Sequence, residues 1–292
     1  MAYTDIDKPS DYFETALWTG NGSTTNITSL DFQPDFTWIK GRSDAIAHVV
    51  FDSVRGAGGN KELTPNETYA EGGNSTISYG FLSSFNSDGF TVRNGTSSPN
   101  QADYTNKNSS TYASWNWKAG TSFTNDASAT GIGTIDSTGS VNTTSGFSII
   151  SYTGNGSANQ SVAHGLGATP KIILIKNRTT AGYWCMTNPR FVSVSDPNIL
   201  YLQTTAAEAD DTNINGTTAP SSTVFGVDDY GAVNTSGNAH IAYCFSEVKG
   251  YSRFNKFIGN GSSDGTFVYT GFKPAFVIAK ESSEARDWQL WD

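Results

Sequence analysis

The sequence has little charge and few of the side chains that most enzymes use for catalysis. Asp, Glu, Lys and Arg make up 15% of its 292 residues, against roughly 25% in an average globular chain. It contains 2 cysteines and 3 histidines. Its net charge of −9 at pH 7 argues against a nucleic-acid partner, because lysine and arginine contacts to phosphate supply most of that affinity.

Long apolar runs are missing as well. No stretch approaches the about 18 apolar residues of a membrane-spanning helix, so no membrane insertion is expected. The N-terminus, MAYTDIDKPSDYF, lacks the basic and apolar regions of a signal peptide. We therefore expect synthesis in a cytoplasm. Cys185 and Cys244 are then expected to be buried thiols, with a disulfide between them as the alternative.

Serine, threonine, asparagine and glycine fill the balance, together with 13% aromatic residues. This aromatic content argues against disorder, since aromatic side chains provide apolar area for a core. Short runs rich in β-branched and aromatic residues, such as FTWIK and KIILIK, are typical of central strands, and no long window shows helical periodicity. The sequence predicts an all-β fold of tandem sandwich units, of a jelly-roll or lectin-like kind.

One short string recurs along the chain and indicates an internal repeat. TGNGS begins at Thr19 and again at Thr153, and IGNGS begins at Ile258. In each copy a proline opens an apolar run that ends in a lysine at constant spacing: Pro34 to Lys40, Pro170 to Lys176 and Pro274 to Lys280. An Asp or Asn follows each lysine at equal distance: Asp52, Asn188 and Asp292. Self-similarity over about thirty residues is typical of a repeat architecture.

The repeat predicts the domain organisation. We expect one unit at residues 1–118, a second at 146–249, and a third that begins at 250 and reaches mid-unit at Asp292. Because half a unit cannot close its core, we expect the sequence to be a fragment of a longer product, with completion by a partner chain as the alternative. Residues 119–145, rich in glycine, serine and threonine, are typical of a linker.

Each repeated string has Asn-Gly at its centre. Asn-Gly between two strand-like runs favours a type I′ hairpin turn, which needs positive φ at both residues. We therefore predict that these pairs are structural turns without chemistry of their own: Asn21-Gly22, Asn155-Gly156 and Asn260-Gly261.

No motif predicts catalysis, a cofactor site or a metal site. His48, His164 and His240 lie far apart in a sequence without a GxSxG motif, so structural roles are expected. Carboxylates that could form a glycosidase pair lie in polar loops, where solvated turn residues are the simpler interpretation: Glu208, Asp210, Asp211, Asp228 and Asp229. The acidic segments AEADDTNIN and FNSDGF lack the spacing of a calcium loop.

Two tryptophans are the candidate ligand-binding residues. Trp115 and Trp117 share one face of the strand-like run TYASWNW. Packing in a core is the expected role. If that face is exposed, the two rings would instead form a platform for stacking sugar rings.

The repeated segments resemble those of known tailed-bacteriophage virion proteins. The matching pieces are LWTGNGS, PDFTWIKGR, AHGLGATPKIILIKNR and the junction HIAYCFSEVKGYSRFNKFIGNGSSDGTFVYTGFKPAFVIAK. Repeats of this kind are similar to those of tail-fibre or host-recognition proteins, common in marine phages, and the resemblance covers nearly the whole chain. It carries no catalytic motif. It implies a non-enzymatic structural component of the virion, with a tail fibre for host attachment as the leading interpretation.

The resemblance also sets the expected partners and the alternatives. It implies contacts with other virion proteins through the N-terminal unit, a homo-oligomer (a trimer, by analogy with fibres) and a host surface saccharide as ligand. The expected location is the virion, assembled in the host cytoplasm. The alternatives are a capsid decoration or head-fibre protein and a polysaccharide-degrading tailspike.

Overall fold

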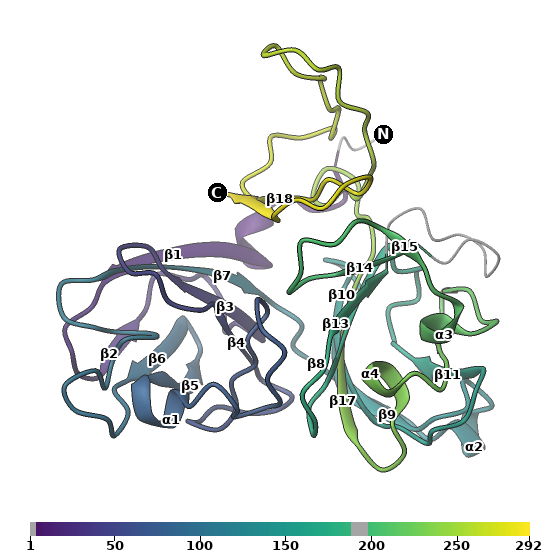
Figure 1. Ribbon diagram of the computed structural model, residues 1–292, viewed down its shortest axis with the longest axis horizontal. Coiled ribbons are helices and arrows are strands. Elements are labelled where there is room, and N and C mark those ends of the chain that lie inside the picture. Colours follow the sequence, from purple (N-terminus) through teal and green to yellow (C-terminus); the bar gives the residue numbers. More distant parts are fainter. Residues whose placement is uncertain (1–3, 188–197) are drawn as a thin grey trace.

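The computed structural model describes residues 4–187 and 198–292 and is all-β, as the sequence predicts. Its helices are single short turns, and its sheets are antiparallel. Figure 1 shows two β bodies side by side, with the end of the chain above them. We call residues 4–119 the first body, residues 120–252 the second body and residues 253–292 the terminal segment.

The first body is a sandwich of two sheets, with strand orders β1-β7-β3-β4 and β2-β6-β5. Ile39 and Phe51 of one sheet and Phe90 of the other are fully buried in a common core. Its elements are η1 (Pro9–Asp11), β1 (Phe13–Thr19), β2 (Thr25–Ile27), β3 (Phe36–Gly41), β4 (Val49–Asp52), α1 (Thr76–Tyr79), β5 (Phe81–Asn86), β6 (Gly89–Arg93) and β7 (Thr111–Trp117).

The second body has an 8-stranded sheet in the order β15-β14-β13-β12-β17-β10-β9-β8, covered by the pair β11-β16. Ile150 and Ile175 of the large sheet and Phe225 of the small one share a buried core. Its elements are β8 (Thr121–Asn125), α2 (Ala127–Thr130), β9 (Ser137–Asn142), β10 (Phe147–Thr153), β11 (Gln160–Ala163), β12 (Ile172–Asn177), β13 (Trp184–Thr187), β14 (Asn198–Tyr201), β15 (Ala209–Asp210), α3 (Thr212–Asn215), β16 (Val224–Val227), α4 (Gly231–Asn234) and β17 (Ala239–Phe245).

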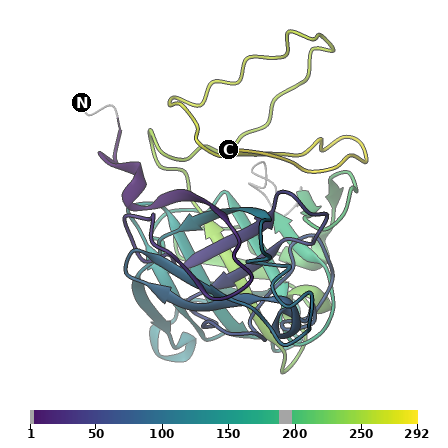
Figure 2. The same ribbon diagram turned by 90° about the vertical axis from the view of Figure 1, so that its left-hand side faces the viewer.

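The two bodies share a strand order. The run β10-β17-β12-β13 repeats β1-β7-β3-β4, and the pair β11-β16 repeats β2-β6. The register agrees too, because Phe13 lies opposite Trp117 in the first body and Phe147 lies opposite Phe245 in the second. In the terminal segment, β18 (Val277–Ala279) and β19 (Gln289–Trp291) form a separate hairpin. Figure 2 shows this segment as extended loops above both bodies.

The prediction of a linker at residues 119–145 is wrong. This stretch contains β8 and β9, which pair with each other, and β9 also pairs with β10. Two strands at the rim of a sheet need few apolar side chains, because much of their surface faces water. Phe123 and Val141 pack these strands on the core, and the serines and threonines gave the stretch its linker-like composition.

The hairpin prediction for Asn21-Gly22 and Asn155-Gly156 is also wrong. β1 pairs with β7 and β2 pairs with β6, so the first TGNGS string carries the chain from one sheet to the other. The second string does the same between β10 and β11. The glycine φ values are positive, 75° at Gly22 and 70° at Gly156 and Gly261, whereas none of the three asparagines has positive φ. A type I′ turn needs both.

Candidate functional site

Of the three histidines, His164 and His240 are buried and His48 is half-buried. His164 accepts a hydrogen bond from the Leu166 amide at Nδ1, and its Nε2 lies 3.1 Å from the Ser221 carbonyl oxygen. Burial lowers the pKa values of His48, His164 and His240 to about 4. They are therefore neutral at pH 7. This arrangement supports the structural roles expected from the sequence.

Three of the candidate carboxylates bind backbone amides or a lysine. Asp228 accepts from the Asn159 amide at 2.8 Å, and Asp211 accepts from the Asn213 amide at 3.0 Å. Glu208 lies 3.5 Å from the Lys256 ammonium. Within residues 4–187 and 198–292, no group of three or more His, Cys, Asp or Glu side chains is placed to hold a metal ion.

Cys185 and Cys244 are free and buried, as expected, so the alternative of a disulfide is wrong. Burial raises the pKa of each thiol to about 12. A thiol that stays protonated near neutral pH is a poor nucleophile and a poor metal ligand.

The sugar-stacking role considered for Trp115 and Trp117 is wrong. Trp115 is 4% exposed and packs between the first body and the rest of the molecule. Trp117 is half-buried among aromatic rings, with its ring centroid 4.8 Å from Phe13 and 5.4 Å from Phe36. Core packing, the expected role, holds because this face of β7 is covered by the second body and the terminal segment.

A buried asparagine holds each of the first two repeated strings, a role that no sequence pattern indicated. The Asn106 side chain donates to Asn21 Oδ1 at 2.8 Å and accepts from the Asn21 amide at 3.3 Å. In the second body, Asn234 donates to Asn155 Oδ1 at 3.2 Å and accepts from the Asn155 amide at 2.9 Å. Both anchoring asparagines are 0% exposed. The recurring string is thus a loop held by a distant amide.

The lysines at the ends of the repeated apolar runs bind loop carbonyl groups. Lys40 donates to Ile46 O at 2.8 Å, and Lys280 donates to Glu284 O at 3.2 Å. Lys176 is fully buried and donates to Gly182 O at 2.6 Å and Thr68 O at 3.0 Å. Burial lowers the pKa of Lys176 to about 8. Because the ammonium is compact and has several donors, it can satisfy carbonyl groups from two loops at once.

The contact between the two bodies is the most distinctive feature of the molecule. Phe36 of β3 lies with its ring centroid 4.6 Å from Tyr243 of β17, within a buried cluster drawn from both bodies. The Tyr243 hydroxyl donates to Asp52 Oδ2 at 2.6 Å. Asp52 also pairs with Arg55, and both side chains are inaccessible to solvent. An ion pair in such a place requires further hydrogen bonds to offset desolvation, and Tyr243 supplies one across the interface.

Polar contacts extend this interface to its edge. Trp184 Nε1 donates to Thr64 O at 2.9 Å, and the Glu71 amide donates to Arg178 O at 3.0 Å. The side chains of Glu71 and Arg178 also form an ion pair. The repeat position that follows β13, Asn188, lies outside the described residues.

Residues 8–292 match a family model described as a domain of unknown function, DUF7483. The chain belongs to the DUF7483 family. No curated protein and no solved structure matches it. Across the described ranges of this DUF7483 chain, no helix is long and apolar enough to cross a membrane.

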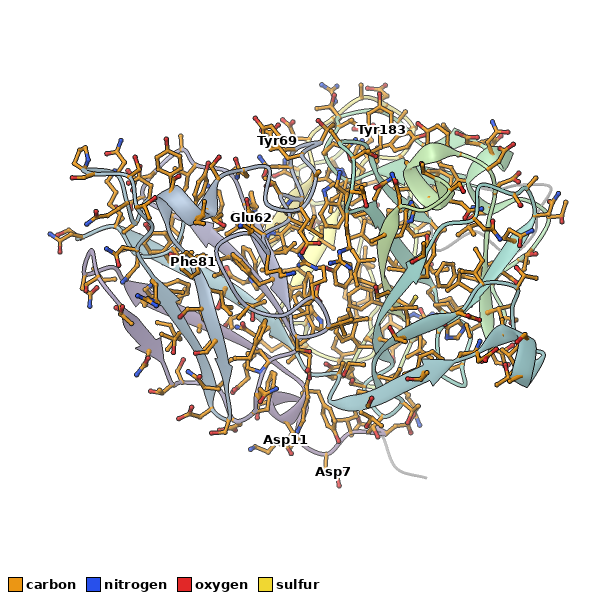
Figure 3. All side chains as sticks on the ribbon, turned by 90° about the horizontal axis from the view of Figure 1, so that it is seen from below. Asp7, Asp11, Glu62, Tyr69, Phe81 and Tyr183 are labelled. Carbon is orange, nitrogen blue, oxygen red and sulfur yellow. The ribbon has the colours of Figure 1, made fainter. Side chains whose placement is uncertain are left out.

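The DUF7483 chain has a shallow groove at the loops that follow β12 and precede α4. Its volume is about 300 Å³, and its lining includes Asn177, Thr180, Tyr183, Tyr230 and Thr235. Tyr183 is 43% exposed. Figure 3 places Tyr183 and Tyr69 along the same edge of the molecule. An exposed aromatic ring beside amide and hydroxyl groups can bind a neutral polar ligand such as a saccharide.

Proposed function

We propose that this protein is a non-enzymatic structural component of a tailed-phage virion, a tail fibre or fibre-like appendage that takes part in host attachment. The proposal includes its construction from tandem β-sandwich units of one repeat. The sequence resemblance to virion proteins supports the particle assignment. The shared strand order and the asparagine anchors support the repeat.

The observation that carries the proposal is the buried interface between the two bodies. Apolar side chains of both bodies form one cluster, and the Asp52, Arg55 and Tyr243 side chains are buried within the contact. Domains joined by a large apolar contact move little relative to one another. A rigid assembly of β units is suited to an appendage that transmits force, and further copies in a homo-oligomer, a trimer in the simplest fibre, would add stiffness.

Electron microscopy of labelled particles tests the virion assignment. An antibody against this protein is added to purified particles of the phage that encodes it, and negatively stained images are scored. We expect label on the tail or its fibres. Label on the head would replace the tail fibre with a capsid decoration or head-fibre protein, and unlabelled particles would overturn the virion assignment altogether.

The groove at Tyr183 is the place that we propose for a host surface saccharide. Stacking of one ring contributes about 0.5–1.5 kcal/mol, so single sites bind weakly and several copies on one particle increase the avidity. We expect Tyr183→Ala to weaken binding to host polysaccharide about 2- to 10-fold. Tyr269→Ala, at a tyrosine that is 71% exposed outside the groove, is the matched control.

Glycan-binding measurements on the two variants decide between the outcomes. Equal loss in both variants, or in neither, would remove the groove from the proposal. New reducing ends after incubation of the protein with polysaccharide would favour the tailspike alternative instead.

A further inference from the structure

Two kinds of hydrogen bond, one from a tryptophan indole and one between backbone groups, each occur twice at matching repeat positions. Trp184 Nε1 donates to Thr64 O of the first body at 2.9 Å, and Trp288 Nε1 donates to Tyr201 O of the second body at 3.3 Å. Trp184 and Trp288 occupy the same position after the repeat lysines Lys176 and Lys280. Thr64 and Tyr201 also occupy matching positions. Thr64 follows Leu63, which bridges to β4, and Tyr201 follows Leu200, which pairs with β13.

The second of these contacts joins backbone atoms. The Glu71 amide donates to Arg178 O at 3.0 Å, and the Glu208 amide donates to Ser282 O at 2.8 Å. Arg178 and Ser282 each lie two positions after a repeat lysine. The terminal segment therefore contacts the second body in the way that the second body contacts the first.

A third kind of contact occurs once between the second body and the first, and once between the first body and the terminal segment. The Tyr243 hydroxyl of the second body donates to Asp52 of the first at 2.6 Å, and Trp115 Nε1 of the first body donates to Asp292 at 3.2 Å. Tyr243 lies two residues before the end of β17, and Trp115 lies two residues before the end of β7. Asp52 and Asp292 lie at the same distance from Lys40 and Lys280.

Aromatic packing repeats with these hydrogen bonds. Phe36 of the first body lies 4.6 Å from Tyr243 and 6.1 Å from Phe147, centroid to centroid. Phe276, at the matching repeat position, lies 5.8 Å from Trp115 and 5.7 Å from Phe13. The first body thus contacts the terminal segment in the way that the second body contacts the first.

Together these contacts close a ring. The same kind of interface leads from the second body to the first, from the first to the terminal segment, and from the terminal segment back to the second. Equivalent directed contacts that return to their start after three steps define an arrangement around a threefold axis. The first body, the second body and the terminal segment occupy the three places of this ring. Figure 1 agrees with this arrangement, since the terminal segment lies above both bodies.

The terminal segment, at the third place, exposes apolar side chains at repeat positions that are buried in the two bodies. Phe267 is 85% exposed, whereas the matching Ile27 and Val162 are 6% and 0% exposed. Trp291 is 53% exposed, whereas the matching Phe51 is 0% exposed. These side chains belong to the faces that a sandwich core covers in the complete bodies.

The strand that is central in each complete body is also missing from the third place. β7 lies between β1 and β3, and β17 lies between β10 and β12. Among the described residues, none forms a strand between residues 252–258 and β18, and β18 pairs with β19 alone. We call this gap the third strand position.

We propose that the protein is a pseudo-threefold ring of β units, and that the third strand position binds a polypeptide segment of the same repeat, equivalent to residues 53–118. This inference rests on the repeat architecture proposed above and is independent of host attachment. The last strand of the segment, a β7-like strand with an aromatic residue at the position of Trp115, inserts between residues 252–258 and β18. The rest of the segment covers Phe267 and Trp291. Backbone hydrogen bonds to both edges provide affinity, and the alternating side chains provide specificity.

The test compares the 292-residue chain with a chain extended directly after Asp292 by a second copy of residues 53–118. Hydrogen exchange of the amides at 252–258 and 277–279 is measured for both, together with the mass in solution. We expect the extension to slow this exchange about tenfold or more in a monomer. The control extension carries prolines at the copies of Ala113 and Trp115, and it should give no protection because proline cannot donate to a ladder.

Unchanged exchange in the extended chain, or equal protection by the proline control, would overturn the proposal. Self-association of the unextended chain with the same protection would also overturn it, because a second copy would then be the occupant. If the extended chain does not fold, a peptide of residues 239–247 is added to the 292-residue chain, with its Ala242→Pro form as control. Protection by neither or by both peptides contradicts the proposal. None of these results depends on particles or host polysaccharide, so failure here leaves the virion assignment to its own experiment.

Discussion

Several buried polar side chains of this protein bind groups of segments that are distant in the sequence. Asn106 and Asn234 hold the loops at Asn21 and Asn155, and Lys176 binds loop carbonyl groups of both bodies. A buried amide or ammonium is costly unless its donors are satisfied, so each such residue fixes the position of its partners. At the scale of the residue, polar side chains define the loops and apolar ones fill the cores.

Replacement of Asn106 by alanine should lower the free energy of unfolding by about 1–3 kcal/mol, because buried groups of the Asn21 loop lose their partner. Asn108→Ala, at an exposed position of the neighbouring loop, should change it by less than about 0.5 kcal/mol. Urea denaturation of the two variants makes the comparison. Similar values for both would show that the Asn106 amide does not hold the loop.

Among the elements, β8 and β9 at one end of the large sheet show how close contact can replace apolar content. Gly139 of β9 lies opposite Ile150 of β10, and a Cβ at this position would lie 1.9 Å from Ile149 O. The backbone of β10 therefore occupies the space of a side chain. A strand of serine, threonine and glycine joins the sheet because its backbone can approach so closely.

Gly139→Ala should therefore detach or distort β9 and β8. We expect a loss of about 1–3 kcal/mol in stability, from the clash with the backbone. Hydrogen exchange should rise in residues 121–142 more than elsewhere. Gly259→Ala, where no atom lies within 4 Å of the added Cβ, is the control and should leave exchange in these strands unchanged. Equal exchange in both variants would mean that β9 tolerates the side chain.

At the scale of the whole molecule, the two bodies share one interior. Phe36 and Trp115 of the first body lie in the same buried cluster as Phe147, Trp184 and Tyr243 of the second. Because these side chains are covered by the other body, separation would expose them to water at a cost of about 25 cal/mol for each Å². We expect the bodies to unfold together.

Tyr243→Phe tests this coupling, because it removes the hydrogen bond to Asp52 while keeping the ring. We expect a loss of about 1–3 kcal/mol and faster hydrogen exchange in both β4 and β17. Tyr152→Phe is the matched variant, since the Tyr152 hydroxyl donates to Val233 O within the second body. It should affect the second body more than the first. Exchange in β4 that does not respond to Tyr243→Phe would show that the bodies are independent.

The fold class and the positions of many strands follow from local sequence patterns. Runs such as FTWIK and KIILIK form β3 and β12, because a central strand needs apolar side chains on both faces. The burial of Cys185 and Cys244 followed from the apolar runs that contain them. These features depend on local composition and spacing, which can be examined in a single sequence.

Strand pairing and the covering of each sheet face depend instead on contacts between segments that are distant in the sequence. Asn21-Gly22 has the composition of a hairpin turn, but pairing of β1 with β7 depends on residues almost a hundred positions away. The sequence is compatible with an exposed or a buried Trp115, and in the folded chain Phe276 and the second body cover its face. Residues 119–145 resembled a linker because β8 and β9, at one end of the large sheet, contain few apolar side chains. Strand pairing and face burial depend on contacts between distant segments, and these contacts cannot be read from a single sequence.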